Sequence, residues 1–88
     1  MASYEIRWKT SAAREIRKLS TDVVRRILAV VQRLADDPFS SGARKIVTTE
    51  CTYRVRAGDY RIVYRVLDDV LVIEIIRVGH RRDVYHRR

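Results

Sequence analysis

A Gly58-Asp59 pair between two alternating segments constrains the fold of this chain more than any other feature. On each side of the pair, arginines alternate with tyrosine and β-branched residues, which is the period of a β-strand. A two-residue turn with glycine at positive φ is typical of a β-hairpin. The turn places Arg56 opposite Arg61 and Arg54 opposite Val63. One face of the hairpin then carries Arg54, Arg56, Arg61 and Arg65, and the other carries Tyr53, Val55, Ile62 and Tyr64.

Two helices are expected in the first half of the chain. Residues 12–19 form the first, with Thr10 or Ser11 as its N-cap. Ser20 caps the second, whose apolar residues recur at helical spacing. This helix stops before Pro38, because the residue before a proline avoids α geometry. Together the two helices predict a helical hairpin.

Strands are expected on both sides of this helical hairpin. Residues 4–8 alternate as a half-buried strand, and Asp68-Asp69 is a candidate second tight turn. The later strands are expected at residues 45–47, 53–56, 60–66 and 70–78. The predicted class is α+β: an N-terminal strand, a helical hairpin and an antiparallel β-meander, with the helices packed on one side of a small sheet.

Length and charge indicate one basic domain over residues 1–88. The net charge is +8, and 16 of the 19 basic residues are arginine. Arginine offers forked donors to phosphate or carboxylate, so this bias favours a polyanionic partner, with RNA or DNA first. A compositional bias of the genome is the alternative explanation.

Cysteine content and apolar content exclude other classes. The single Cys51 excludes an intramolecular disulfide and a Cys-based zinc site, and we interpret it as a buried thiol. Apolar runs reach only about four residues, too short for a membrane span. The charged N-terminus lacks the apolar core of a signal peptide. We therefore expect a cytoplasmic protein with no cofactor, no metal and no membrane partner.

The arginine-bearing face of the hairpin is the candidate site. Like charges opposite each other on neighbouring strands are destabilising, so the cluster favours an anionic ligand. Glu74 is expected near Val63, within reach of Arg61 or Arg65. One carboxylate does not neutralise four guanidinium groups. A solvated polar face with a single ion pair is the alternative interpretation.

The C-terminal segment adds further candidates. Arginines crowd it, and Gly79 permits a sharp break at the end of the last strand. Tyr85 is suited to stacking on a base, although capping the core is its alternative role. His80 titrates near neutrality and is a candidate acid or base, or else a hydrogen-bonded histidine at the rim. The residues expected to bind RNA here and on the sheet are Arg65, Arg77 and Arg82.

These residues give the chain a resemblance to RelE-type toxins of the RelE/ParE toxin–antitoxin superfamily. The resemblance spans nearly the whole length and lies in three ordered stretches, Tyr53-Arg-Val-Arg56, Asp59-Tyr-Arg-Ile-Val-Tyr64 and Val78-Gly-His-Arg-Arg-Asp-Val-Tyr85. It implies an endoribonuclease that enters the ribosomal A site and cuts mRNA there. It also implies a small RelB-like antitoxin that wraps the toxin and masks its basic face.

The resemblance also implies site residues. Two sheet lysines of the best-studied members correspond to Arg54 and Arg56, and the remaining catalytic positions are Arg61, Arg81 and Tyr85. The chain departs from those members in three ways. Arginine replaces both lysines, a further basic position is Val47, and His80 stands where those members have a basic residue.

RNA cleavage by the 2′-hydroxyl needs a base, stabilisation of the phosphorane charge and an acid for the leaving oxygen. A cationic cluster supplies mainly charge stabilisation and alignment. Tyr85 needs neighbouring cations before it can act as a base, since a tyrosine pKa is ordinarily near 10. Two other functions stay open at this point: a ParE-like inhibitor of DNA gyrase, and a non-catalytic module that binds RNA or an antitoxin.

Overall fold

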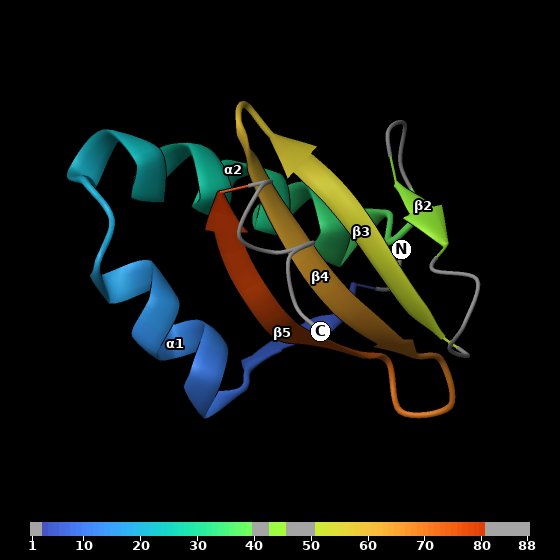
Figure 1. Cartoon of the computed structure of the whole chain (residues 1–88). Coiled ribbons are helices and arrows are strands. Elements are labelled where there is room, and N and C mark those ends of the chain that lie inside the picture. The colour runs from blue at the N-terminus through green and yellow to red at the C-terminus, as the bar shows by residue number, and fades with distance from the viewer. Residues whose placement is uncertain (1–2, 40–42, 46–50, 81–88) are drawn as a thin grey trace.

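The part of the chain that the structure describes forms a five-stranded sheet with two helices against one face (Figure 1). The computed structural model describes residues 3–39, 43–45 and 51–80. Within this part the strands follow the order β1-β5-β4-β3-β2, and the predicted α+β class is confirmed. The elements are β1 (Glu5–Trp8), α1 (Thr10–Arg17), α2 (Thr21–Asp36), β2 (Arg44–Lys45), β3 (Thr52–Ala57), β4 (Tyr60–Leu67) and β5 (Val72–His80).

Helix α2 begins and ends where the sequence predicts. The Ser20 hydroxyl accepts a hydrogen bond from the Val23 backbone N–H at 3.4 Å, as an N-cap does. The helix ends at Asp36, and Asp37 is already extended ahead of Pro38. Its apolar stripe of Ile27, Val30, Val31 and Leu34 is buried against the sheet.

Helix α1 begins earlier than predicted. It starts at Thr10 and not at Ala12, and Lys9 occupies the N-cap position without a side-chain hydrogen bond. The expected capping role of Thr10 or Ser11 is therefore wrong. The Ser11 hydroxyl instead donates to the Ile76 carbonyl oxygen at 3.1 Å, so this side chain ties the helix to β5.

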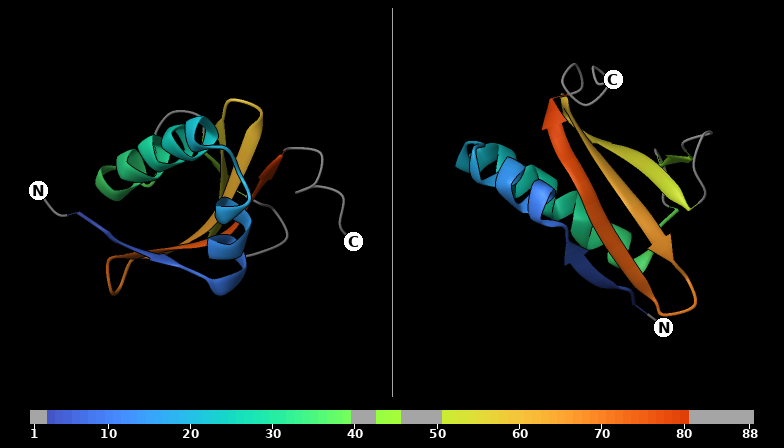
Figure 2. Two further views of the ribbon diagram at one scale, coloured as in Figure 1. Left: turned by 90° about the vertical axis from the view of Figure 1, so that its left-hand side faces the viewer. Right: turned by 60° about the horizontal axis from the view of Figure 1, so that its bottom comes forward.

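The sheet is mixed, whereas an antiparallel sheet was predicted. Strands β3, β4 and β5 form the expected antiparallel meander, but β1 pairs with β5 in parallel, with Glu5 against Val72 and Trp8 against Ile75. Parallel neighbours need a long crossover, and the intervening chain with both helices supplies it. Figure 2 shows β1 beside β5 at this side of the sheet.

The β4–β5 connection is longer than the predicted Asp68-Asp69 turn. Leu67 pairs with Val72, so residues 68–71 form a four-residue turn, and β5 starts at Val72 instead of Val70. Leu71 takes a φ of 54° there. A register shift between Val63 and Tyr64 then displaces the β5 partners by one residue. Such an irregularity leaves no signal in the alternating pattern.

The core lies between the helices and one face of the sheet. On this face of the β3–β4 hairpin every second side chain is buried or, at Tyr53 and Tyr60, partly buried, as the alternation predicts. Cys51 does not join the core: it is exposed, which makes the interpretation as a buried thiol wrong. The buried sheet residues that belong to the core are Val55, Ala57, Ile62, Tyr64, Val66, Ile73, Ile75 and Val78.

Tyr64 is the largest of these fully buried side chains. Its hydroxyl donates to the Pro38 carbonyl oxygen at 2.6 Å, so one hydrogen bond joins the sheet to the end of α2. Its ring stacks against Tyr53 with the centroids 5.9 Å apart. Burial raises the pKa of the Tyr64 phenol well above its usual range.

We expect a Tyr64→Phe variant to lose about 1–3 kcal/mol at neutral pH, because the buried Pro38 carbonyl oxygen loses its donor. The raised pKa adds a pH dependence. The folded state keeps the phenol neutral, so its contribution is full below pH 10 and falls as the pH rises above 10. Urea unfolding between pH 7 and 11 should therefore show a smaller gap between the two proteins at high pH. A constant gap would contradict this account.

Candidate nucleic-acid interface

The β3–β4 hairpin has the predicted register. Ala57 pairs with Tyr60, Arg56 with Arg61 and Arg54 with Val63. Gly58 takes a φ of 66°, which an L side chain adopts only with strain, so the glycine fixes the two-residue turn. The alternation therefore turns the arginines to the face of the sheet that lies away from the core.

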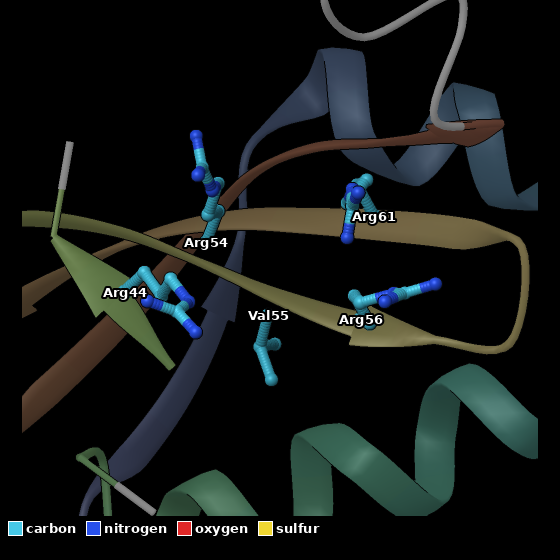
Figure 3. Close-up of a pocket in the computed structure, with 5 residues that line it drawn as sticks. All are labelled: Arg44, Arg54, Val55, Arg56 and Arg61. Atoms are coloured by element: carbon cyan, nitrogen blue, oxygen red, sulfur yellow. The ribbon is translucent and has the colours of Figure 1, made fainter. Parts of the chain in front are cut away.

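Four arginines line one pocket on this face. The pocket has a volume of about 140 Å³ and is lined by Arg44, Arg54, Val55, Arg56 and Arg61. Figure 3 shows the guanidinium groups coming from three neighbouring strands, β2, β3 and β4. We call it the four-arginine pocket. The β5 residue opposite Arg61 is Gly79, which has no side chain.

The charge of this pocket is one-sided. Among the residues that the structure describes, none that lines this pocket is acidic. Arg56 and Arg61 stand directly opposite each other across the hairpin, an arrangement of like charges that costs roughly 0.2–1 kcal/mol. Forked donors converging from three strands suit the oxygens of a phosphate group.

Sequence reasoning missed Arg44. It pairs with Arg54 across β2 and β3 and brings a fourth guanidinium to the pocket from the edge of the sheet. The expected strand at 45–47 left Arg44 outside any element, whereas the structure includes it in β2; residues 46 and 47 lie outside the described part. Starting the expected strand one residue earlier would have included Arg44.

Arg65 has an acidic neighbour on the same face. Its Nη1 atom lies 3.3 Å from Oε1 of Glu74, and the two residues are partners in the β4–β5 register. Of the two predicted partners of Glu74, Arg65 is the one that the structure shows. Glu74 lies opposite Arg65, two residues along β4 from Val63, because the four-residue turn sets Leu67 against Val72.

Arg77 is held by a carboxylate from α1. Its Nη2 lies 3.0 Å from Oε2 of Glu15, whose other oxygen accepts the Val78 backbone N–H at 2.7 Å. Strand β1 pairs with β5 only as far as Ile75, so Glu15 takes over the hydrogen bonding of β5 beyond that point. The carboxylate therefore fixes the strand end that leads toward residues 81–88.

We expect Glu15→Ala to cost about 1–3 kcal/mol, because it leaves the Val78 N–H and the Arg77 guanidinium without this acceptor. Glu5→Ala is the matched control. Its ion pair with Arg7 is 63% exposed on both sides and contributes roughly 0–1 kcal/mol. Equal losses in urea unfolding would show that Glu15 has no special role at β5.

The structure separates His80 from the four-arginine pocket. His80 pairs with Tyr60, which belongs to the core-facing side of the hairpin, and the two rings meet edge to face with centroids 5.6 Å apart. The same ring lines a different hollow, next to Glu15 and Lys18. We therefore assign His80 no acid or base role in the four-arginine pocket.

Three predicted site residues, Arg81, Arg82 and Tyr85, lie outside the described residues. Within the described part, no group of three or more His, Cys, Asp or Glu side chains is arranged to hold a metal ion. Nor does any helix in that part have the length and apolar character needed to cross a membrane. The observed site is thus the arginine cluster of the sheet.

Known proteins are similar to this chain in sequence and in fold. Residues 6–85 match the family model described as the ParE toxin of the type II toxin–antitoxin system, parDE. Toxin RelG of Mycobacterium tuberculosis is 35% identical to this chain over 96% of it and 98% of the relative. A putative RelE-like toxin protein of Escherichia coli is 28% identical over 94% of this chain and 90% of the relative.

A solved structure supports the same relationship. The structure of the intact E. coli RelBE toxin–antitoxin complex contains a chain that is 28% identical, with a TM-score of 0.79 over 89% of this chain and 96% of that one. The chain belongs to the RelE/ParE superfamily of type II toxin–antitoxin toxins.

Proposed function

We propose that this toxin is a ribosome-dependent endoribonuclease that cuts mRNA in the A site and so stops translation. The observation that carries the proposal is the four-arginine pocket, in which guanidinium groups from three strands converge and none of the described lining residues is acidic. The similarity to Toxin RelG and to the RelE-like toxin supports it. A cationic pocket of this kind selects for the phosphate backbone of a nucleic acid.

The proposed reaction is a transesterification at one phosphate. The 2′-oxygen attacks phosphorus and gives up its proton, a bond from phosphorus to this oxygen forms, and the bond to the 5′-oxygen breaks as that oxygen takes a proton. Arg61, Arg54 and Arg56 stabilise the extra negative charge of the phosphorane from the sheet. Arginine stays protonated, so it serves as a clamp and not as a base.

Arg81 and Tyr85 complete the proposal. Arg81 is assigned to the scissile phosphate, and Tyr85 to proton removal or stacking. As a base Tyr85 needs neighbouring cations, because a tyrosine pKa is ordinarily near 10. Arg65, Arg77 and Arg82 receive a secondary role in holding the RNA. For Arg65 and Arg77 the reason is that each already has a carboxylate partner. Chemistry this dependent on alignment fits a requirement for the ribosome to position the mRNA.

The proposed partner that controls the toxin is a small RelB-like antitoxin. Solved relatives are RelB–RelE complexes, including the archaeal complex from Pyrococcus horikoshii OT3, whose matching chain is 26% identical with a TM-score of 0.79 over 90% of this chain and 96% of that one. An acidic segment that folds on binding would complement a toxin of net charge +8. The proposed activity on translating ribosomes implies a cytoplasmic location.

Inhibition of DNA gyrase is the second candidate, because the matching family model carries the ParE description. The two activities separate in one pair of assays. We expect the purified protein to stop cell-free synthesis of a reporter with shortened mRNA, and to leave gyrase supercoiling unchanged at the same concentration. Full-length mRNA together with blocked supercoiling would replace the ribonuclease proposal with the gyrase one.

A further inference from the structure

A second basic hollow lies between α2 and the end of β3. It has a volume of about 300 Å³, and we call it the α2 groove. In Figure 3, α2 passes below the β3 edge that carries Arg56. The groove is lined by Arg26, Ala29, Val30, Arg33, Arg56, Ala57 and Gly58.

Three of the lining residues are arginines, and the other four are uncharged. Arg26 and Arg33 are seven residues apart, so they rise from the same face of α2 about 10 Å from each other along the axis. The other lining residues add no charge: Ala29 and Val30 come from α2, and Ala57 and Gly58 from the hairpin. Nη1 of Arg26 reaches the hairpin turn, where a Cβ on Gly58 would lie 3.6 Å away.

The α2 groove continues the four-arginine pocket, because Arg56 lines both hollows. In the described part β2 pairs only with Tyr53 and Arg54, so it does not extend along β3 to the groove. None of the described residues that line either hollow is acidic. Together they present six arginines along one path, from Arg44 at the sheet edge to Arg33 on α2.

We propose that the α2 groove binds the phosphate backbone of the nucleotides that flank the cut bond in single-stranded RNA. The inference rests on the proposed ribonuclease function and extends it to the substrate outside the reacting bond. Continuity with the four-arginine pocket favours an RNA strand over an acidic peptide, since a strand held at Arg61 can pass Arg56 and reach Arg26 and Arg33.

These flanking contacts lie away from the reacting atoms. They bind substrate and transition state equally, so their loss should raise KM and leave kcat unchanged. Each lost phosphate contact on a single strand also lowers the salt dependence of binding by about 0.7 in the log–log slope. Loss of Arg26 and Arg33 together should lower that slope by about 1.4.

The test uses the full chain and 2′-O-methylated RNA, which cannot be cut. Binding of a short and a long single-stranded oligonucleotide is measured by fluorescence anisotropy against salt, for wild type and for Arg26→Gln/Arg33→Gln. The matched control is Arg14→Gln/Arg25→Gln, which removes the same charge from exposed positions that line neither hollow. Thermal unfolding confirms that all three proteins fold.

We expect wild type and the control to bind the long RNA more tightly than the short one, and the groove variant to lose most of that gain. Its KM in ribosomal cleavage should rise about tenfold while kcat stays within twofold. Equal slopes and equal length dependence in both variants would overturn the proposal. The proposal would also be overturned if the groove variant bound poly-glutamate more weakly than wild type but bound RNA equally well. That result would assign the groove to an acidic protein. Failure of wild type to cleave mRNA would sink the ribonuclease function, while the binding result would still judge the groove.

Discussion

Replacing Arg61 with alanine is expected to lower the rate of ribosome-dependent mRNA cleavage by roughly 10²–10³-fold, the effect of losing one preorganised charge-stabilising donor. Arg61 faces Arg56 across the hairpin, with Gly79 opposite on β5. The register of the sheet therefore fixes the position from which the Arg61 side chain enters the pocket. Single-turnover cleavage on programmed ribosomes gives the measurement.

Two further variants separate charge from geometry at this position. Arg61→Lys keeps the charge but loses the forked donors, so we expect an intermediate rate. Arg25→Ala removes one charge from an exposed position on α2 that lines neither hollow, and it should cleave at nearly the wild-type rate. Equal losses in Arg61→Ala and Arg25→Ala would mean that only net charge matters.

Ile62→Ala is expected to give the largest loss of stability, about 2–5 kcal/mol, because it opens a cavity under the pocket. Ile62 is fully buried and lies between Val55 on β3 and Val78 on β5. For a domain of this size the loss corresponds to a fall in Tm of more than about 10 °C. Calorimetry measures it directly.

Val63→Ala is the matched control for this variant. Val63 is the next residue on β4, but it faces the side of the arginines and is only partly buried. We expect a loss under about 1 kcal/mol. A larger effect at Val63 than at Ile62 would contradict the assignment of the two faces and, with it, the position of every arginine in the pocket.

The β3–β4 hairpin was predicted correctly from the sequence. The positive φ of Gly58 fits a two-residue turn, which sets the register from Ala57 to Arg54. Alternation along each strand then decides which face each residue occupies. Both the register and the arginine face could therefore be predicted from neighbouring residues. The end of α2 before Pro38 was equally local. These features depend on neighbours in the chain and were predicted correctly.

The features that were missed depend on distant parts of the chain. The parallel pairing of β1 with β5 and the bond from Ser11 to Ile76 join segments more than sixty residues apart. The four-residue turn between Leu67 and Val72 placed Glu74 beside Arg65, and His80 pairs with Tyr60 and does not line the pocket. Arg44 reached the pocket through pairing of a two-residue strand. None of these contacts has a local pattern.

Mapping mRNA ends on ribosomes with a defined A-site codon tests the central claim most directly. Primer extension compares wild type and Arg61→Ala, each with ribosome-bound and with naked mRNA. The account predicts new ends within the A-site codon for wild type on ribosomes, and almost none with Arg61→Ala or on naked mRNA. Intact mRNA on ribosomes treated with wild type, or equal cleavage by Arg61→Ala, would contradict it.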